Sequence, residues 1–418
     1  MGKKTFDISR RDFLKAGALA TGTLAVPSVG RGMGRVHEPT PPARIDREVM
    51  SCCQFCQVRC TTLVQVRDDK VVNVYGNPAN TWTKGGMCPK GQSLVELANH
   101  PQRLLYPLKR EGGGWKRIGY AEALAMVADR ILKVKADFPE DYARRVALFA
   151  PLWESHESEI MAQMAMRMAG FPEICSSGDT CIGNSATALR ICLGSAVSTT
   201  TLDEALNAQT LLLWGANIAE TYPLYIRWIA DARDRGVRVI YIDPRRTPTT
   251  GHSDEQIMAR PGTDGALALG LIRYLIHENL YDRNYVARYV NGFKELAESA
   301  EPFTIEKVAK TTWIAQERIV VLAKRLAASK RTILWMGGSL SRSTNAIQTV
   351  RALVALQALT ANLSGTGKGI MNMQGGKPGG LEELEEKYRS KDLAVAFGYR
   401  KVLLGMDQKR VKVLLLNS

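Results

Sequence analysis

The sequence predicts an α/β protein in which a small β-rich domain precedes doubly wound parallel-sheet domains. The first observation behind this prediction is the stretch Thr61–Val74, where apolar and polar residues alternate on both sides of a short turn, as in a β-hairpin. The second is that amphipathic stretches of helical length alternate with short apolar runs from residue 122 onward. This βαβα order is typical of a parallel sheet with helices on both faces.

Each expected element follows from its periodicity and its flanking residues. In the hairpin, Asp68-Asp69-Lys70 forms the turn, and Gly76-Asn77-Pro78 ends the second strand. The expected helices, in which apolar residues recur at helical spacing, are residues 122–136, 156–169, 186–193, 223–235, 265–278, 315–329 and 344–363. The expected buried strands, which are continuous apolar runs, are residues 145–150, 210–215, 237–242 and 332–336.

The N-terminus has the pattern of an export signal. Ser9-Arg10-Arg11-Asp12-Phe13-Leu14-Lys15 is a twin-arginine motif, and the apolar run 16–26 follows it. That run is shorter than the roughly 20 apolar residues of a membrane span, so no transmembrane segment is predicted. We expect residues 1–36 to be a twin-arginine signal peptide that directs the folded protein to the periplasm. A buried N-terminal helix is the alternative.

Length and charge set further limits. A chain of 418 residues exceeds the usual size of a single core, so two or three domains are expected. The formal charge is +15, of which residues 1–36 contribute +5 through seven basic and two acidic residues. Because the rest of the chain has no run of five or more basic residues, we expect no nucleic-acid partner.

Four cysteines have the spacing of a metal-cluster site. Cys53, Cys56 and Cys60 are close together, and Cys88 follows after twenty-seven residues. Four thiolates of this spacing suit a cubane [4Fe-4S] cluster, because three neighbouring ligands and a distant one can surround a compact inorganic core. Two alternatives stay open here: a Cys₄ zinc site, which usually has a second C-x₂-C pair that this chain lacks, and two disulfides.

Polar and small residues follow the strands expected in the second half of the chain. Such positions bind ligands in doubly wound sheets, because the loops after the strands meet at one edge. An acidic residue at a strand end can hold a ribose or a guanine edge, and adjacent arginines can bind phosphates. The loops concerned are residues 214–220, Asp243–Thr247, Arg260–Gly265 and Gly337–Arg342. Each loop alone is more often a structural turn, but their occurrence together favours a nucleotide-like cofactor.

Four motifs, taken in order along the chain, resemble the dimethyl sulfoxide reductase superfamily. They are the cysteine motif that ends in Cys88-Pro-Lys-Gly, the segment Leu213–Pro223, the triplet Asp243-Pro244-Arg245 and the quartet Pro261–Asp264. The resemblance implies a molybdopterin-dependent oxidoreductase with one [4Fe-4S] cluster, held by the four cysteines. It also implies molybdenum or tungsten bound by two pyranopterin guanine dinucleotides.

The resemblance also implies a domain organisation. After the signal peptide 1–36, residues 45–110 form the [4Fe-4S] domain, and residues 177–375 form the second α/β domain, which binds the dinucleotide. Residues 111–176 and 376–418 form the first α/β domain, which is expected to be incomplete. The family's C-terminal β-barrel is expected to be absent, so the chain resembles a truncated or split protein that would retain the pterin poorly.

Site residues are carried over by position within the motifs. Lys90, otherwise an ordinary surface lysine, would lie between the cluster and one pterin as an electron relay. The positions expected to bind the cofactor are Trp214, Gly215, Asn217, Glu220, Asp243, Pro244, Arg245, Gly262, Asp264, Gly338, Ser339 and Gln374.

The candidate ligand of the molybdenum or tungsten is Cys181. Its distance along the chain from Gly215 resembles that in family branches with a cysteine ligand, and it precedes an expected helix, whose N-terminus stabilises a thiolate. Cys192 and Cys175 are the alternatives. Cys192 is expected to be a buried core residue of the helix 186–193, although the sequence after it resembles the ligand region of some nitrate reductases.

A cysteine ligand implies two-electron oxygen-atom or sulfur transfer on a small inorganic substrate such as polysulfide, thiosulfate or an arsenate-like anion. Formate dehydrogenases have a histidine directly after the ligand, where this chain has Ile182, and an arginine in the loop that here reads Met373-Gln374-Gly375. Nitrate reductase, formate dehydrogenase and a non-catalytic electron-transfer subunit remain the alternatives. The expected partners are a ferredoxin-like iron–sulfur subunit and a membrane subunit that handles quinol.

Overall fold

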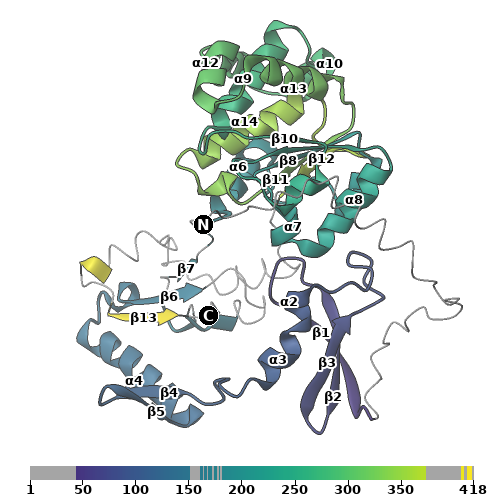
Figure 1. Ribbon diagram of the computed structural model, residues 1–418. Helices are drawn as coiled ribbons and strands as arrows, with labels where there is room; N and C mark the ends of the chain where they lie inside the picture. The colour runs from purple at the N-terminus through teal and green to yellow at the C-terminus, as the bar shows by residue number, and fades with distance from the viewer. Residues whose placement is uncertain are drawn as a thin grey trace, which may run out of the picture. The chain divides into compact units, whose positions relative to one another are not determined.

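A computed structural model describes residues 44–150, 161–162, 164–166, 168–171, 174–176, 178, 181–372, 406–408 and 412–416 (Figure 1). The chain divides into two compact units, residues 1–47 and 48–418, and nearly all described residues belong to the second. The expected signal peptide, the start of the expected helix 156–169 and Gln374 lie outside the described residues.

A three-stranded sheet carries the cysteine motif. Its strands are β1 (Arg47–Cys52), β2 (Thr61–Arg67) and β3 (Lys70–Gly76), in that order. The predicted hairpin is confirmed: β2 and β3 pair antiparallel, and Asp68 and Asp69 both have the positive φ that a tight two-residue hairpin turn requires. β1 was not predicted, because its sequence lacks a clear apolar–polar alternation. Five of its six residues are exposed in the structure.

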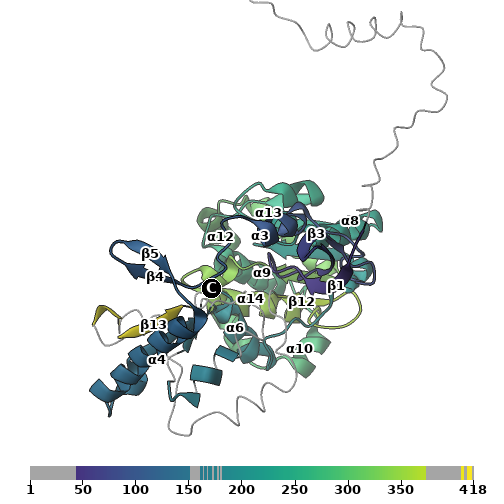
Figure 2. The same ribbon diagram turned by 90° about the horizontal axis from the view of Figure 1, so that it is seen from below.

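A second group of elements follows in the chain. The β4–β5 hairpin lies beside α4 (Figure 2). Three parallel strands, in the order β13-β6-β7, form a separate small sheet. The bounds of this group are α2 (Pro89–Gln92), α3 (Leu94–Asn99), β4 (Leu108–Glu111), β5 (Gly114–Arg117), α4 (Tyr120–Asp137), β6 (Val146–Ala150), β7 (Ile174–Ser176) and β13 (Val413–Leu416).

The central sheet has five parallel strands in the order β10-β9-β8-β11-β12. The chain runs outward from β8 through β9 to β10, then returns to β11 on the other side of β8, so the winding direction reverses between β8 and β11. Ligands bind at such a reversal in doubly wound sheets. The bounds are β8 (Thr210–Trp214), β9 (Arg238–Ile242), β10 (Glu255–Ile257), β11 (Thr332–Met336) and β12 (Gly369–Met371).

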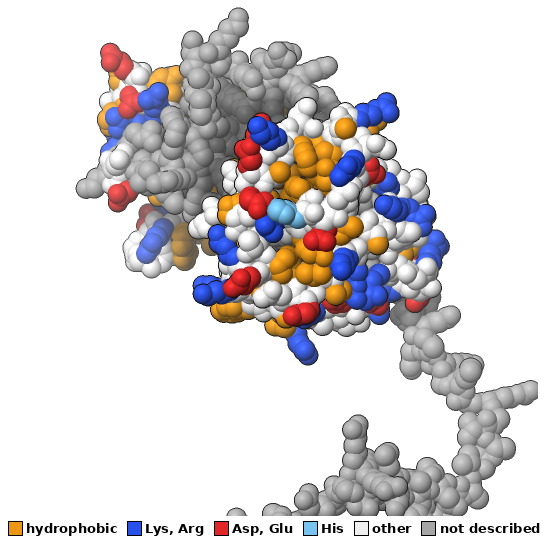
Figure 3. Space-filling view, turned by 90° about the horizontal axis from the view of Figure 1, so that it is seen from above, with side chains coloured by type: hydrophobic (Ala, Val, Ile, Leu, Met, Phe, Trp, Pro, Cys, Tyr) orange, Lys and Arg blue, Asp and Glu red, His pale blue; other side chains and the backbone are white. Residues whose placement is uncertain are grey.

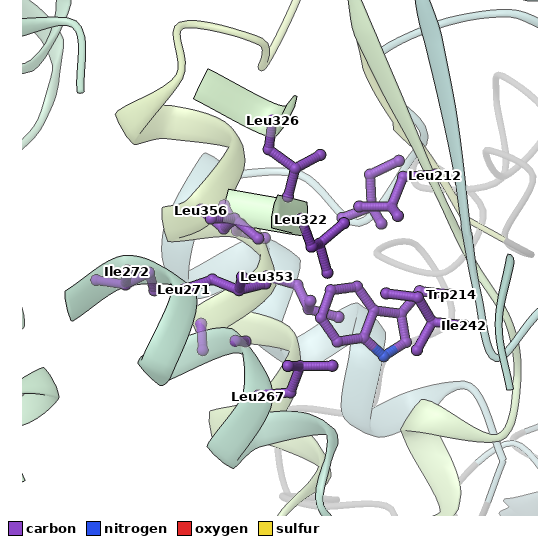
Figure 4. Packing of buried hydrophobic residues seen from close by; sticks show 14 of the residues in the cluster. Leu212, Trp214, Ile242, Leu267, Leu271, Ile272, Leu322, Leu326, Leu353 and Leu356 are labelled. Carbon is purple, nitrogen blue, oxygen red and sulfur yellow. The ribbon is translucent and has the colours of Figure 1, made fainter. Parts of the chain in front are cut away.

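Two apolar layers cover this sheet because alternate residues of a strand point to opposite faces. Leu212 and Trp214 of β8 pack in one layer, with Leu267, Leu322 and other leucines of the surrounding helices (Figure 4). Leu211 and Leu213 pack on the other face, in a cluster that also contains Cys53. All five residues of β8 are buried, as expected for a parallel strand covered on both faces.

The bounds of the helices in this part are α6 (Gly183–Leu193), α7 (Ile218–Thr221), α8 (Ile226–Asp234), α9 (Asp264–His277), α10 (Arg283–Tyr289), α11 (Phe293–Ala300), α12 (Ile305–Thr312), α13 (Gln316–Ala328) and α14 (Ala346–Leu359). Each helix predicted in this part has a counterpart among the described residues, but α7, α10, α11 and α12 were not predicted. The expected helix 223–235 begins instead with a 3₁₀ turn, Pro223–Tyr225, before α8. The expectation that Cys192 is buried was wrong, because it lies on the exposed side of α6.

Surface charge is interspersed on the face seen from above, where basic side chains lie among acidic and apolar ones (Figure 3). None of the helices in the described ranges is both long enough and apolar enough to span a bilayer.

Candidate active site

The four cysteines of the N-terminal motif lie on two loops that the backbone holds tightly. The amide of Cys53 donates to the carbonyl oxygen of Cys60 at 2.9 Å. The amide of Arg59, which has a φ of 47°, donates to the carbonyl of Cys56 at 3.2 Å and closes a turn. Cys88 caps the N-terminus of α2, where Pro89 begins the helix. These contacts fix the two loops without using any thiol.

The four sulfur atoms share one locality. Burial and the nearby thiols of Cys56, Cys53 and Cys88 raise the pKa of Cys60 to about 12. Burial also raises the pKa of Cys56, with Cys53 and Cys88 adding to the shift. Because each thiol disfavours ionisation of the next, a bound cation would be stabilised by all of them together.

This thiol group fits an iron–sulfur cluster better than the two alternatives. The four cysteines of the motif are described, and none of these four is in a disulfide. Over the described ranges, no three His, Cys, Asp or Glu side chains converge closely enough to hold a single metal ion. A zinc ion with Zn–S bonds of about 2.3 Å would bring its sulfurs within about 3.8 Å of one another. Four grouped thiols with this spacing along the chain match a cubane core.

Lys90 lies near this group. Its ammonium lowers the pKa of Cys56, against the larger effect of burial. The Lys90 side chain is exposed. The backbone carbonyl oxygen of Lys90 accepts a hydrogen bond from the hydroxyl of Ser93 at 2.8 Å. Lys90 is therefore an exposed cation placed beside one cysteine of the motif.

The end of β8 and the end of β11 approach closely at the reversal of the sheet. Gly215 has a φ of 61°, and its carbonyl oxygen accepts from the hydroxyl of Ser339 at 3.0 Å. The amide of Gly337 donates to the carbonyl of Trp214 at 2.9 Å. A Cβ on Gly337 would overlap the carbonyl of Gly215, so only glycine fits there. The predicted positions Gly215, Gly338 and Ser339 thus line one backbone junction.

Asn217 and Glu220 belong to a hydrogen-bonded group after β8. The Asn217 amide donates to the Glu220 carboxylate, and Thr249 Oγ1 donates to Asn217 Oδ1 at 2.7 Å. The same Thr249 hydroxyl accepts from the amide of Ala219 at 3.0 Å. Thr249 is fully buried, so it fixes the loop, while Glu220 is exposed and can contact a ligand.

Asp243, Pro244 and Arg245 follow β9. The carboxylate of Asp243 accepts from the amide of Arg245 at 2.9 Å, which orients both side chains at the strand end. Asp243 is buried and Arg245 is exposed. A held carboxylate beside an exposed guanidinium can bind a hydroxyl or amine edge and a phosphate, respectively.

Asp264 begins α9, and Gly262 precedes it with a φ of 79°. The Asp264 carboxylate accepts a hydrogen bond from the indole N–H of Trp214 at 2.8 Å. Burial raises the pKa of Asp264, partly offset by that hydrogen bond. The Trp214 side chain is fully buried (Figure 4), so it positions Asp264 from below the surface.

Cys181 lies two residues before α6, and its amide donates to the carbonyl of Gly178 at 3.1 Å. Its side chain is buried, with a relative exposure of 9%. The guanidinium of Arg342 donates to the Cys181 sulfur over 3.1 Å. Of the alternatives, Cys175 lies in β7 of the small sheet, and Cys192 is exposed near the far end of α6.

One aromatic residue links the two groups of thiols. Burial raises the pKa of Tyr222, with further contributions from Cys56 and Cys181 and an opposing one from Arg342. The Tyr222 hydroxyl donates to Gln57 Oε1 at 2.7 Å, and its ring stacks on Trp335. Tyr222 therefore lies close to the cysteine loop and to the Cys181 loop.

Sequence reasoning missed Tyr222 and Gln57, and it placed Arg342 in a loop without assigning it a role. One signal could have found them: Gln57 lies between two motif cysteines, and Tyr222 lies within the motif after β8. A pocket of about 600 Å³ between β4, α4 and β13 lies elsewhere, and none of the predicted site residues lines it.

Comparison with known families matches three parts of the chain. Residues 103–411 match the molybdopterin oxidoreductase family, and residues 46–100 match the molybdopterin oxidoreductase Fe4S4 domain. Residues 7–27 match the signal sequence of the twin-arginine translocation pathway. The prediction of a twin-arginine export signal is thereby confirmed.

Individual relatives are distant and longer. The F420-dependent formate dehydrogenase subunit alpha of Methanocaldococcus jannaschii is 28% identical over 331 residues, which are 78% of this chain and 48% of that protein. The thiosulfate reductase molybdopterin-containing subunit PhsA of Salmonella typhimurium is 28% identical over 378 residues, 86% of this chain and 47% of that protein. The chain thus spans about half the length of the curated relatives it matches.

A solved structure gives the same fold. The acetylene hydratase of Pelobacter acetylenicus superposes with a TM-score of 0.66 and 27% identity, over 75% of this chain and 43% of that one. The predicted α/β class, with a small β-rich domain and parallel sheets, is confirmed.

The family matches also agree with the predicted cofactors, a [4Fe-4S] cluster and a pterin-bound molybdenum or tungsten. The grouped thiols and the polar loops at the sheet reversal fit these two cofactors chemically. Since the family match covers more than half of its residues, the chain belongs to the molybdopterin oxidoreductase family, within the dimethyl sulfoxide reductase superfamily.

Proposed function

We propose that this chain is the catalytic part of an oxidoreductase that transfers an oxygen or sulfur atom to or from a small inorganic substrate, with electrons relayed through a [4Fe-4S] cluster. The observation that supports this most is Tyr222, which lies near Cys56 of the cysteine motif and near Cys181. Because one side chain neighbours both sulfur sites, electrons have a short path between them.

The cluster site uses Cys53, Cys56, Cys60 and Cys88 as thiolate ligands. Iron would replace the protons that burial and the neighbouring thiols favour on Cys56 and Cys60. Lys90 is the proposed relay position, since its ammonium lies near Cys56 and can be shared with a pterin.

Cys181 is the proposed ligand of the molybdenum or tungsten. Of the three candidates it is the buried thiol that contacts the loop after β11, whereas Cys175 belongs to the small sheet and Cys192 is exposed. The guanidinium of Arg342 donates a hydrogen bond to its sulfur over 3.1 Å. When bound, the pterin–metal group supplies the two-electron chemistry, and the protein binds and orients it.

The guanine dinucleotide tails would lie along the loops after β8, β9 and β11. Asp243 and Asp264 are held carboxylates that can accept hydrogen bonds from a guanine or ribose, and Arg245 can bind a phosphate. Gly215 and Ser339 allow close approach of the backbone at the reversal. The division into a [4Fe-4S] domain and two α/β domains, which the sequence motifs imply, is part of the same proposal.

The proposed substrates are polysulfide, thiosulfate or an arsenate-like anion, which agrees with the relative PhsA being a thiosulfate reductase subunit. Formate oxidation is the second candidate, because the Methanocaldococcus relative is a formate dehydrogenase subunit. Ile182 in place of histidine disfavours it. The proposed compartment is the periplasm, and the proposed partners are a ferredoxin-like subunit and a membrane quinol-handling subunit.

The proposal is tested on the full-length protein, purified anaerobically. We expect iron, acid-labile sulfide and stoichiometric molybdenum or tungsten, and viologen-linked turnover of thiosulfate, polysulfide or arsenate. Cys181→Ser should remove turnover by at least about 100-fold while the iron content stays, since it deletes a ligand that acts in the chemical step. The control is Cys192→Ser, an exposed cysteine.

Three results would contradict the proposal. Absence of molybdenum and tungsten would favour a non-catalytic electron-transfer subunit. Turnover of formate alone would favour the second candidate. Full activity in Cys181→Ser would place the metal ligand elsewhere.

A further inference from the structure

Arg342 contacts a sulfur atom rather than a carboxylate. Arg318 and Arg325 pair with the carboxylate of Glu255, as arginines at a protein surface commonly do. Arg342 instead donates to a sulfur, that of Cys181, at 3.1 Å. Within the described ranges, no carboxylate lies at ion-pair distance from it. Among the described residues, no acidic side chain therefore neutralises its positive charge.

The backbone holds this arginine at Cys181. Its neighbour Ser341 is buried, and the Ser341 hydroxyl accepts from the amide of Ser185 at 3.1 Å. The side-chain amide of Asn184 donates to the carbonyl of Ser341 at 2.8 Å. Both partners belong to the first turn of α6, directly after the Cys181 loop. Two hydrogen bonds thus join the Arg342 turn to the loop that carries the thiol.

The guanidinium has donors to spare. Arginine has five N–H groups in a planar fork, and the Cys181 sulfur uses one of them. The residue is exposed, whereas Cys181 is buried beneath it. The nearby Tyr222 hydroxyl donates its proton to Gln57 Oε1 at 2.7 Å. An exposed fork with an unneutralised charge is suited to two-point binding of an oxyanion.

We propose that Arg342 binds the negative charge of the substrate at this site, so that the enzyme selects small oxyanions or sulfur anions over neutral oxygen-atom donors. The proposal rests on the proposed function for the location of the reaction at Cys181. It adds a specificity-determining residue and a charge requirement. A purely positioning role, in which Arg342 only holds the Cys181 sulfur, would not distinguish anionic from neutral substrates.

Steady-state kinetics of the full-length holoenzyme separate the two roles. The variants are Arg342→Gln and Arg342→Lys, and the control is Arg351→Gln, an exposed arginine of α14 that contacts Gln348. Arg342→Gln should raise KM for thiosulfate or arsenate by about 10- to 100-fold, the value of a charge-assisted hydrogen bond. For trimethylamine N-oxide or dimethyl sulfoxide, which carry no net charge, the KM should change much less, so that the ratio of kcat/KM for the anions to kcat/KM for the neutral substrates falls by about 10-fold or more. Arg342→Lys should give an intermediate KM for the anions.

A second readout needs no turnover. At constant ionic strength, millimolar sulfate should raise the melting temperature of the wild type and of Arg351→Gln, but not that of Arg342→Gln. If no redox activity is found with any substrate, the proposed function fails while sulfate binding still tests Arg342. Equal losses for neutral and anionic substrates, or equal sulfate shifts in all variants, would overturn the inference.

Discussion

At the scale of the residue, the site is built from polar groups that the fold holds in unfavourable surroundings. Asp264 illustrates this, since burial raises its pKa while the indole of Trp214 keeps it in place. An ionised buried carboxyl lowers the free energy of unfolding. A protein keeps such a residue where the carboxyl binds a ligand.

The Asp264→Asn substitution tests this view. Its amide oxygen can still accept from Trp214, but it carries no charge. Burial raises the folded-state pKa of Asp264 above the unfolded one. The contribution of Asp264 to the free energy of unfolding is therefore greatest below about pH 4 and is lost as the pH rises through the folded pKa. In full-length protein made without the pterin, D264N should therefore be more stable than wild type at pH 7, by an amount that shrinks toward pH 4.

Urea denaturation at both pH values measures the difference. The matched control is Asp282→Asn, at the exposed N-cap of α10, where asparagine caps as well as aspartate. A gain for D264N that does not change between pH 4 and pH 7 would contradict the pKa assignment.

At the scale of the element, the junction of β8 and β11 forms the floor of the site. The two strands are pressed together at Gly215 and Gly337, and the backbone hydrogen bond between Gly337 and Trp214 closes the gap. Only residues without a side chain allow this approach.

Gly337→Ala should therefore destabilise the protein by about 1–3 kcal/mol, the usual cost of forcing a methyl group into a packed region. The midpoint of urea denaturation reports the change. A Cβ on Gly251 would meet no atom within 4 Å, so Gly251→Ala is the control. Equal stability of the two variants would show that the junction can relax.

The sequence allowed prediction of those elements whose pattern is local. The runs that became β8 and β11 are wholly apolar, and the Asp68-Asp69 turn defines its hairpin. β10 and β12 have three residues each, too few for a periodic pattern, and the sequence did not predict them. The exposure of Cys192 was missed because a short helix does not define which side the core covers.

The site was predictable where motifs carry it and not where tertiary contacts do. The cysteine spacing indicated the cluster loops, and strand ends indicated Asp243 and Asp264. The contact of Tyr222 with Gln57 joins residues 165 apart, and that of Arg342 with Cys181 joins residues 161 apart. No local pattern determines such pairs, because they depend on how the sheet is wound.

In the molecule as a whole, the fold brings together two sulfur sites from different parts of the chain. The cysteine motif packs into the apolar layer on one face of the central sheet, together with β8 and β11 residues. The Cys181 loop lies at the start of α6, near the same Tyr222. Electron transfer between a cluster and a second metal requires this closeness.

X-ray absorption at the molybdenum or tungsten edge of the full-length, anaerobically purified protein would show whether Cys181 binds the metal. We expect a metal surrounded mainly by sulfur, with one sulfur ligand fewer in Cys181→Ser and no change in Cys192→Ser. An identical set of sulfur ligands in wild type and Cys181→Ser, or no such metal at all, would contradict this expectation.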